Sequence, residues 1–594
     1  MSSRQRWFSA LIIALAFVLR VAALDLRPAH FDEGVNGAFV DGMRTEGCYE
    51  YKPDNFHGPL HFYVLFASQQ LFGRSLWSLR MPTVLIGTAT IALMLAFRRF
   101  LAWRAVWIAA LAAAVSPGMV FYSRYAIHET WLPFFTILAV YGGFGIARRD
   151  RRPGDLWALG AGLSGMVLTK ETYFVHWIAA ALAVIAVRFL DWLAPLTPSA
   201  QRPRPADLFS GGSYQRDTAN IVRFTSRQIA TLTLACLSGV VLFQSGFAMN
   251  WPGITGLYET FRLMFEKGTT AETGHNKEFF YWLKLMAWYE WPALLGIVAA
   301  PVLSLRRSPL PAAALLLGGA AIVAAGLMAK SGVASPEAND FLSPKLNMDI
   351  ATSLGVWLLV CSLGFFAASP AQSREARWLC LYGLASFTAY SLIPYKTPWC
   401  IINLLWPFFF ALGQLADNLS QTADKRLVYA FGALLSWIPL REGWQLNYVH
   451  PTIDGERYAY VHSTPDINKL FRAVRAIVRG NPLQRQMHGL ILADAFPFTW
   501  ELNEFPDITY LDENAAVENY DADFMLVPSP RALEFEDRVF GVYFKESVRV
   551  RNGVPRAWLY LDAERFASLF PGRTPEIHPR VPLKNPALPD PRRK

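Results

Sequence analysis

Long apolar runs recur along most of this chain, and they limit its fold more than any other feature. The runs lie at about 8–26, 79–97, 105–122, 130–147, 156–169, 173–190, 228–247, 291–304, 309–329, 350–368, 377–394, 399–416 and 427–440. Most of them approach the ~20 residues that an α-helix needs to cross ~30 Å of hydrocarbon. The sequence therefore predicts an α-helical polytopic membrane protein with about 13 transmembrane helices.

The composition agrees with a membrane protein. Of the 594 residues, 53% are hydrophobic and only 17% are charged, whereas soluble domains are about 25% charged. Five cysteines, at positions 48, 236, 361, 380 and 400, form no CxxC pair, so we expect neither a disulfide framework nor a structural zinc site. The sequence contains no Walker loop, no GxGxxG and no internal repeat, and a soluble nucleotide site is therefore not expected.

Basic clusters between the apolar runs predict the topology. They lie at 4–6, 98–104, 147–152, 202–227, 306–307, 374–377 and 424–426. Because cytoplasmic loops are enriched in Lys and Arg, these clusters place the N-terminus in the cytoplasm and the C-terminus outside. The run at 8–26 lacks a clean cleavage site, so we interpret it as a retained first span. The net charge of +10 then reflects topology in an inner (plasma) membrane and gives no reason to expect nucleic acid binding.

Two regions do not fit the pattern of spans. The apolar run at 58–73 is short, and counting it as a span would reverse every later loop, so we expect a juxtamembrane helix along the outer interface. Residues 1–444 then form the transmembrane domain, with its first outer loop at about 27–78. Residues 445–575 contain no run of span length and are expected to form a small α/β domain outside the membrane, followed by a Pro-rich disordered tail at 576–594.

The α/β prediction rests on short strand-like segments. They lie at 488–495, 507–511, 522–527, 542–551 and 557–562, and helical patterns lie at 466–479 and 530–538. Apolar and β-branched segments of this length are typical of strands.

Charged and histidine side chains gather at the predicted outer ends of the spans. They are His30, Asp32, Glu33, His57, His61, Arg80, Arg124, His128, Glu129, Lys170, Glu171 and Lys396. Charges at membrane depth usually line a cavity, form pairs or take part in chemistry. Cations beside acids, open to both the bilayer and the outside, suit an anionic phosphate headgroup on a lipid tail.

This arrangement predicts a specific reaction. If a polyprenyl phosphate carries a sugar, its transfer to an acceptor hydroxyl needs a carboxylate that accepts the hydroxyl proton and cations that stabilise the leaving phosphate. Asp32 or Glu33 suits the first role, and Arg124, Lys170 and Lys396 suit the second. No cofactor or metal is required, and in-line attack would invert the anomeric centre. Gly34 and Gly37 would leave room for a sugar beside Asp32.

Each of these residues also has a simpler interpretation. Asp32 could be a solvated loop acid or a helix cap, and Glu33 could start a helix. Arg124 could pair with Glu129, and Lys170 with Glu171. Lys396 could anchor the interface with its aromatic neighbours, and Arg80 could be a snorkelling anchor. His57, His128 and His176 with Asp32 could instead bind a divalent metal, although His57 is better suited to contact the sugar or the phosphate.

The motifs resemble those of a known superfamily. "HFDEGVN", "HGPLHFY", "SLWSLRMP", "YSRYAIHE", "LTKET" and "YKTPW" are similar, in their order, to the GT-C glycosyltransferases, nearest the protein O-mannosyltransferases and lipid A aminoarabinose transferases. Within these, they look like a subfamily named for its association with archaeal flippase activity. The resemblance covers about 8–440 and implies a GT-C fold and an inverting hexosyl or pentosyl transferase, with Asp32 as the catalytic first-loop carboxylate and Glu33 as its partner. The implied partners are a polyprenyl-linked sugar donor, the bilayer, and a glycan, lipid or protein acceptor.

Two other functions are compatible with the same residues. A flippase or scramblase for lipid-linked glycans would need charges along a path through the membrane and an internal repeat, whereas the charges here gather at one face. A non-catalytic assembly factor would use the C-terminal domain to bind partners.

Overall fold

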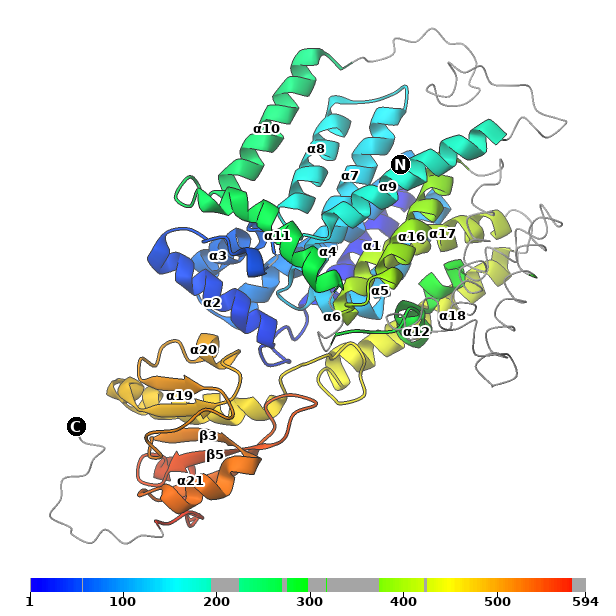
Figure 1. The fold of residues 1–594 in the computed structure, drawn as a ribbon. Coiled ribbons are helices and arrows are strands. Elements are labelled where there is room, and N and C mark those ends of the chain that lie inside the picture. The colour runs from blue at the N-terminus through cyan, green and yellow to red at the C-terminus, as the bar shows by residue number, and fades with distance from the viewer. Residues whose placement is uncertain are drawn as a thin grey trace, which may run out of the picture. The chain divides into compact units, whose positions relative to one another are not determined.

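The computed structural model describes residues 2–55, 57–193, 224–269, 275–297, 317, 373–420 and 425–579. The chain divides into two compact units. The first, the helical unit, consists of Met1–Ala22, Met43–Gly73 and Arg80–Val449. The second, the mixed unit, consists of Ala23–Gly42, Arg74–Leu79 and His450–Lys594. Figure 1 shows the elements of both units.

Helices form most of the helical unit (Figure 1). They are α1 (Ser3–Val21), α3 (Leu60–Phe72), α4 (Leu76–Ala96), α5 (Trp103–Val115), α6 (Pro117–Ser123), α7 (Trp131–Ala147), α8 (Pro153–Val167), α9 (Tyr173–Leu193), α10 (Ser226–Gln244), α11 (Pro252–Thr269), α12 (Tyr281–Tyr289), α16 (Arg374–Leu392), α17 (Ile402–Ser420) and α18 (Lys425–Trp444). The first residues of α4 belong to the mixed unit. The mostly helical fold is therefore confirmed.

Each predicted apolar run that the structure describes overlaps a helix, whereas α11 and α12 lie outside the predicted runs. The runs at 309–329 and 350–368, and part of 291–304, lie outside the described residues. Within the described part of the chain, four helices are long and apolar enough to cross a membrane, at 76–99, 128–147, 226–244 and 398–420. A fifth is added if α5 and α6 count as one bent span. The number of 13 spans and their sidedness stay predictions, as does the interfacial position of α3.

The break between α5 and α6 is held by two buried side chains of opposite charge. The two helices bend by 57° at Ser116, which exposes backbone groups that need partners. Arg20 donates to the carbonyls of Ala114 (3.2 Å) and Ala113 (3.4 Å) at the end of α5. Glu290 accepts from the Ser116 hydroxyl and the Gly118 amide, both at 2.7 Å, at the start of α6. Each charge thus complements the dipole of the helix end that it contacts.

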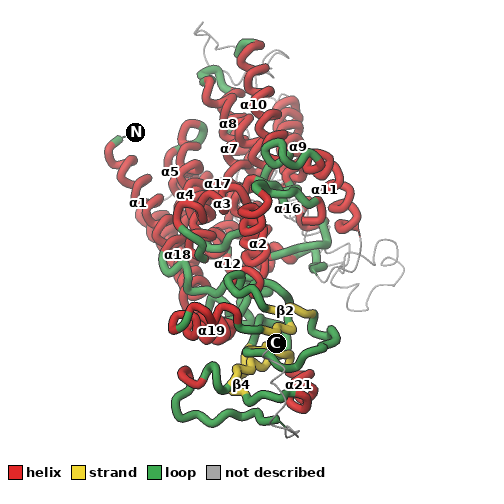
Figure 2. The backbone as a smooth tube through the Cα atoms, turned by 90° about the vertical axis from the view of Figure 1, so that its left-hand side faces the viewer, coloured by secondary structure: helices red, strands yellow, loops and turns green. Residues whose placement is uncertain are grey.

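The mixed unit contains a five-stranded sheet. Its strands are β1 (Gly489–Leu492), β2 (Ile508–Leu511), β3 (Phe524–Pro528), β4 (Tyr543–Val548) and β5 (Ala557–Asp562), in the order β2-β1-β3-β5-β4. β1 pairs in parallel with β2 and β3, and β5 pairs antiparallel with β3 and β4. All five predicted strands are confirmed, and Figure 2 shows strands only in this part of the chain.

Helices cover both faces of this sheet. α19 (Asn468–Gly480) lies on one face and α21 (Ala532–Arg538) on the other, while a short α20 (Phe498–Glu501) was not predicted (Figure 1). The sheet has a hydrophobic core on each face, and alternate residues of β3 belong to different cores. Phe524 packs with the residues of α19, and Met525 packs with those of α21. This period of two is expected for a strand that is buried on both faces.

The stretch expected to be an outer loop after the first span contains a helix. α2 runs over Phe31–Glu46 and begins within "HFDEGVNG". Three glycines lower the helix propensity of this segment by about 1 kcal/mol each relative to alanine, so the sequence did not favour a helix there. The packing of its glycines, described below, overrides that propensity.

Candidate functional site

A short backbone pairing joins two of the predicted site segments within the helical unit. His57 and Lys170 form an antiparallel bridge. The Gly58 amide donates to the Thr169 carbonyl at 3.0 Å. A Cβ at Gly58 would overlap the carbonyl group of Leu168, so only glycine allows this approach. "HGPLH" and "LTKET" are therefore brought side by side, as the prediction of a common site requires.

A buried ionic cluster lies at this bridge. The Lys170 ammonium is 2.6 Å from a Glu129 carboxylate oxygen and 3.7 Å from one of Glu171. His57 Nδ1 is 3.3 Å from the other oxygen of Glu171. The side chains of Lys170, Glu129 and Glu171 are only 6%, 4% and 11% exposed. Lys170 is thus neutralised by two acids, and its pairing with Glu171 is present.

The charges in this cluster stabilise one another. Burial disfavours the charge of Lys170, but the carboxylates of Glu129 and Glu171 outweigh it and hold the pKa of Lys170 well above its ordinary value. Burial likewise disfavours the Glu171 carboxylate, while Lys170 and His57 lower the pKa of Glu171. We therefore expect both groups to be charged at neutral pH.

Three histidine rings pack beside the cluster. The ring centroids of His57 and His128 are 4.3 Å apart, and those of His61 and His128 are 4.1 Å apart. Burial lowers the pKa of His61 to about 3, so this ring is neutral. In the part of the chain that the structure describes, no group of three or more His, Cys, Asp or Glu side chains could hold a metal. His176, part of the alternative metal site, contacts the hydroxyls of Tyr382 and Tyr390 at 2.6 and 3.0 Å.

Lys396 differs from Lys170 because no acid among the described residues pairs with it. The segments around Lys396 and His275 pair as a short antiparallel bridge, with the Lys396 amide donating to the His275 carbonyl at 3.1 Å. Lys396 is 2% exposed and its ammonium donates to the Lys277 carbonyl at 3.1 Å, and no described carboxylate lies within ion-pair distance. Burial lowers the pKa of Lys396 to about 8, although the charge of Glu278 acts against this. The buried ammonium has lost its contacts with water, and a bound anion would compensate for that loss.

The two arginines of the predicted site are buried. Arg124 donates to the carbonyls of Arg20 at 3.2 Å and of Ala22 near the end of α1, and its guanidinium lies 4.6 Å above the ring of Tyr448. It therefore caps α1 and does not pair with Glu129, contrary to the alternative that we considered. Arg80 is 1% exposed within the first turns of α4, which does not fit a side chain that snorkels along a lipid-facing surface.

The acidic pair belongs to the mixed unit, where its two members have different roles. The His30 amide donates to Glu33 at 3.1 Å, and the Asp32 amide donates to His30 Nδ1 at 3.0 Å. This arrangement resembles a capping box with histidine at the N-cap, except that the ring accepts from the second helical residue and not from the third. Glu33 is fully buried, whereas the Asp32 side chain is 37% exposed. The interpretation of Glu33 as a helix start is thus confirmed, and Asp32 is the more accessible of the two.

The structure also fixes the protonation of the capping histidine. Burial is the main reason that the pKa of His30 is lowered. Because Nδ1 accepts from the Asp32 amide, Nε2 carries the proton and donates to the Tyr460 carbonyl at 3.2 Å. The first loop is thereby tied to the C-terminal domain. This partner was not predicted, although H-x-x-E before a helix resembles the usual S/T-x-x-E capping signal.

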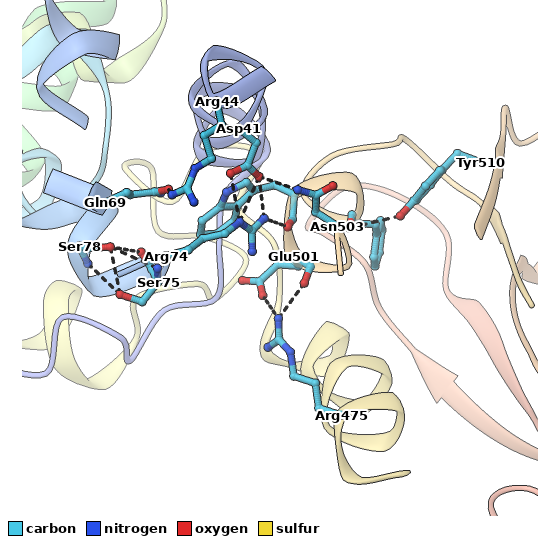
Figure 3. Close-up of polar contacts among 12 residues, drawn as sticks. Asp41, Arg44, Gln69, Arg74, Ser75, Ser78, Arg475, Glu501, Asn503 and Tyr510 are labelled. Carbon is cyan, nitrogen blue, oxygen red and sulfur yellow. Dashed lines mark hydrogen bonds and ion pairs between the residues drawn. The ribbon is translucent and has the colours of Figure 1, made fainter. Parts of the chain in front are cut away.

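An arginine clamp joins the three pieces of the mixed unit (Figure 3). Arg74 binds both carboxylate oxygens of Asp41 in α2, donates to the Trp500 carbonyl and lies 4.8 Å above the Trp500 ring. Asn503 also donates to Asp41, at 3.0 Å. Figure 3 shows the Arg74 guanidinium beside the Asp41 carboxylate of α2, which Asn503 also contacts. No local pattern in the sequence signals these contacts.

Gly34 and Gly37 of α2 allow close packing against the C-terminal domain and do not leave open space. A Cβ at Gly34 would lie 2.6 Å from Pro497 Cα, and a Cβ at Gly37 would overlap the indole of Trp500. The space beside these glycines is therefore filled by the C-terminal domain. The expectation that they leave room for a sugar beside Asp32 is wrong for this face of α2.

We expect Gly37→Ala to loosen α2 from the C-terminal domain, because its methyl group would displace Trp500. Overpacking of this kind costs about 1–3 kcal/mol. Hydrogen exchange of the full-length protein should become faster across 30–42. Gly143→Ala, which meets no neighbour within 4 Å, is the matched control, and Trp500→Ala in the Gly37→Ala background should recover part of the loss. Unchanged exchange in Gly37→Ala would contradict the packing.

Comparison with known proteins supports part of this picture. Residues 56–196 match the model of a family described as dolichyl-phosphate-mannose-protein mannosyltransferase. That segment, about a quarter of the chain, contains the ionic cluster and the histidines. No curated protein matches the sequence.

Solved structures resemble the chain over most of its length. ArnT from Cupriavidus metallidurans bound to undecaprenyl phosphate is 12% identical, with a TM-score of 0.50 over 94% of this chain and 98% of that one. The apo form of the same protein is 14% identical, with a TM-score of 0.45 over 95% and 99% of the two chains. The oligosaccharyltransferase of Archaeoglobus fulgidus is 12% identical, with a TM-score of 0.45 over 94% and 76%. The first likeness shows that this chain has an ArnT-like fold.

Proposed function

We propose that this chain, which has an ArnT-like fold and a segment matching the mannosyltransferase family, is a membrane glycosyltransferase. It transfers a sugar from a polyprenyl-phosphate or diphosphate donor to an acceptor hydroxyl on the outer face of a plasma membrane. The observation that carries the proposal is Lys396, a buried cation for which the described residues offer no acid. The ArnT structure was solved with undecaprenyl phosphate bound, which supports the same class of lipid as the donor.

Lys396 is the strongest candidate for binding the donor phosphate. The charge of Lys170 is already balanced by Glu129 and Glu171, and Arg124 is engaged by backbone carbonyls. A charge-assisted hydrogen bond to phosphate would compensate Lys396 for its lost hydration. The carboxylates and histidines beside Lys170 are then suited to contact sugar hydroxyls, with His57 the most exposed of them at 28%.

Asp32 is our candidate for the base. In the reaction, the acceptor oxygen attacks the anomeric carbon and its proton passes to the Asp32 carboxylate. The bond from that carbon to the phosphate oxygen breaks, and the phosphate leaves with the electron pair. Glu33 is occupied at the helix cap, so of the two acids Asp32 is the better base. The narrower resemblance to the subfamily linked to archaeal flippase activity stays a prediction.

The binding of undecaprenyl phosphate to the full-length protein tests the donor side. We expect Lys396→Met to weaken it by about 10- to 100-fold, the effect of losing a hydrogen bond to a charged group. Affinity should also fall as the pH rises through about 8, because the unbound Lys396 then loses its proton. Titration in detergent at pH 7 and pH 9 would measure both effects.

Lys284→Met is the matched control for this experiment. Lys284 lies in the neighbouring α12 segment, is 55% exposed and pairs with Glu278, so its loss should leave binding nearly unchanged. Equal affinity in Lys396→Met and the natural protein, or affinity that rises with pH, would contradict the assignment of Lys396.

A further inference from the structure

A cavity of about 560 Å³ lies at one end of the helical unit. Its rim is formed by the start of α1, the end of α4 and the start of α8, and it carries Gln5, Ser9, Arg98, Arg99 and Arg152. None of these residues belongs to the site around Lys170 or Lys396. The cavity is therefore a second polar feature, and the proposed transfer reaction assigns it no role.

The rim of this cavity carries uncompensated positive charge. Arg99 is paired with Asp155, with one contact at 3.0 Å, and also donates to the Asp150 carbonyl at 2.9 Å. Arg98 and Arg152 are exposed and have no acidic partner among the described residues. Two positive charges thus face the cavity, which suits one or two negative charges on a ligand.

The other wall of the cavity is apolar. It is formed by Ile13 of α1 and by Ala92, Leu95 and Ala96 of α4. α4 lies within a segment long and apolar enough to cross a membrane, so this wall leads from the arginines along an apolar helix. Trp103 and Tyr141 complete the lining, and such rings are typical of the level of lipid headgroups.

We propose that this cavity binds the phosphate group of an anionic phospholipid, with its acyl chains along the apolar wall of α1 and α4. Basic pockets between transmembrane helices are suited to lipid headgroups because they combine charge with apolar surface. A free phosphate ion would use the arginines but leave the apolar wall without a partner. A zwitterionic lipid would bring a positive choline toward the two arginines. The inference does not depend on the proposed transfer reaction.

Native mass spectrometry of the full-length protein in detergent tests this proposal. With phosphatidylglycerol as the probe, we expect the double variant Arg98→Gln/Arg152→Gln to bind about 25-fold more weakly, at about fivefold for each basic residue lost. Phosphatidylcholine should bind the natural protein much more weakly than phosphatidylglycerol. Inorganic phosphate at millimolar concentration should not displace the bound lipid.

Arg6→Gln/Arg149→Gln is the matched control, because it removes the same charge from two exposed arginines that do not line the cavity. It should bind phosphatidylglycerol as the natural protein does. The proposal is overturned if the two double variants behave alike, if phosphatidylcholine binds equally well, or if inorganic phosphate alone displaces the lipid. Ala96→Phe, which narrows the apolar wall and keeps both arginines, should also weaken binding, and no effect would argue against a lipid chain there.

Discussion

Replacing Lys170 by methionine should destabilise the helical unit by about 3–5 kcal/mol, the usual effect of removing one partner from a buried ion pair. The change leaves the buried carboxylates of Glu129 and Glu171 without the ammonium that now lies 2.6 and 3.7 Å from them. Their charge cannot be hydrated there, so one or both must take up a proton or the segment must open. A lower unfolding temperature of the full-length protein in detergent would measure the loss.

Two variants separate this effect from the loss of any lysine. Glu129→Gln combined with Lys170→Met removes one charge of each sign and should recover a large part of the stability. Lys284→Met removes the cation of an exposed pair, 55% and 36% exposed, and should change stability by less than about 0.5 kcal/mol. If Lys170→Met behaves like Lys284→Met, the cluster does not hold the unit together.

Asp32→Asn should lower the rate of sugar transfer by about 100- to 10,000-fold, the range expected when a general base is lost. The stability of the protein should hardly change, because the side chain is 37% exposed. Glu33→Ala should behave in the opposite way. It removes the buried acceptor of the His30 amide and should cost about 1–2 kcal/mol of stability.

Transfer and unfolding should be measured on the same preparations of these two variants. The comparison uses two adjacent acids with the same charge, so it separates catalysis from folding. Full transfer activity in Asp32→Asn would remove Asp32 as the base. A large loss of stability in Asp32→Asn would show that it acts instead in the helix start.

Regular elements with strong apolar patterns could be predicted from the sequence. α7 begins one residue after the start of the predicted run at 130–147 and ends with it, and β5 matches the predicted strand at 557–562. Such segments are decided by local periodicity. α2 could not be predicted in this way, because its glycines are unfavourable in an isolated helix and favourable only against Pro497 and Trp500.

Charged residues at the ends of spans could be predicted from the sequence, but of their ion pairs only that of Lys170 with Glu171 was expected. Charges at span ends identified Lys170, Glu129 and Arg124, yet the partner of each is set by distant packing. Lys170 meets Glu129 from 41 positions away, and Arg124 meets the backbone end of α1. A sequence shows which side chains are charged, whereas the burial that makes a pair strong depends on the fold.

The mixed unit consists of pieces that lie far apart in the sequence, and this affects how it forms during synthesis. Its first helical piece, Ala23–Gly42, is synthesised roughly 400 residues before the domain that covers Gly34 and Gly37. At ribosomal speeds of about 5–20 residues per second, this piece waits roughly 20–80 s for its partner. During that interval the face of α2 that carries Gly34 and Gly37 is uncovered. A shortened chain that stops before residue 450 would keep this face uncovered permanently, so quality-control proteases should recognise such chains at their N-terminal loop.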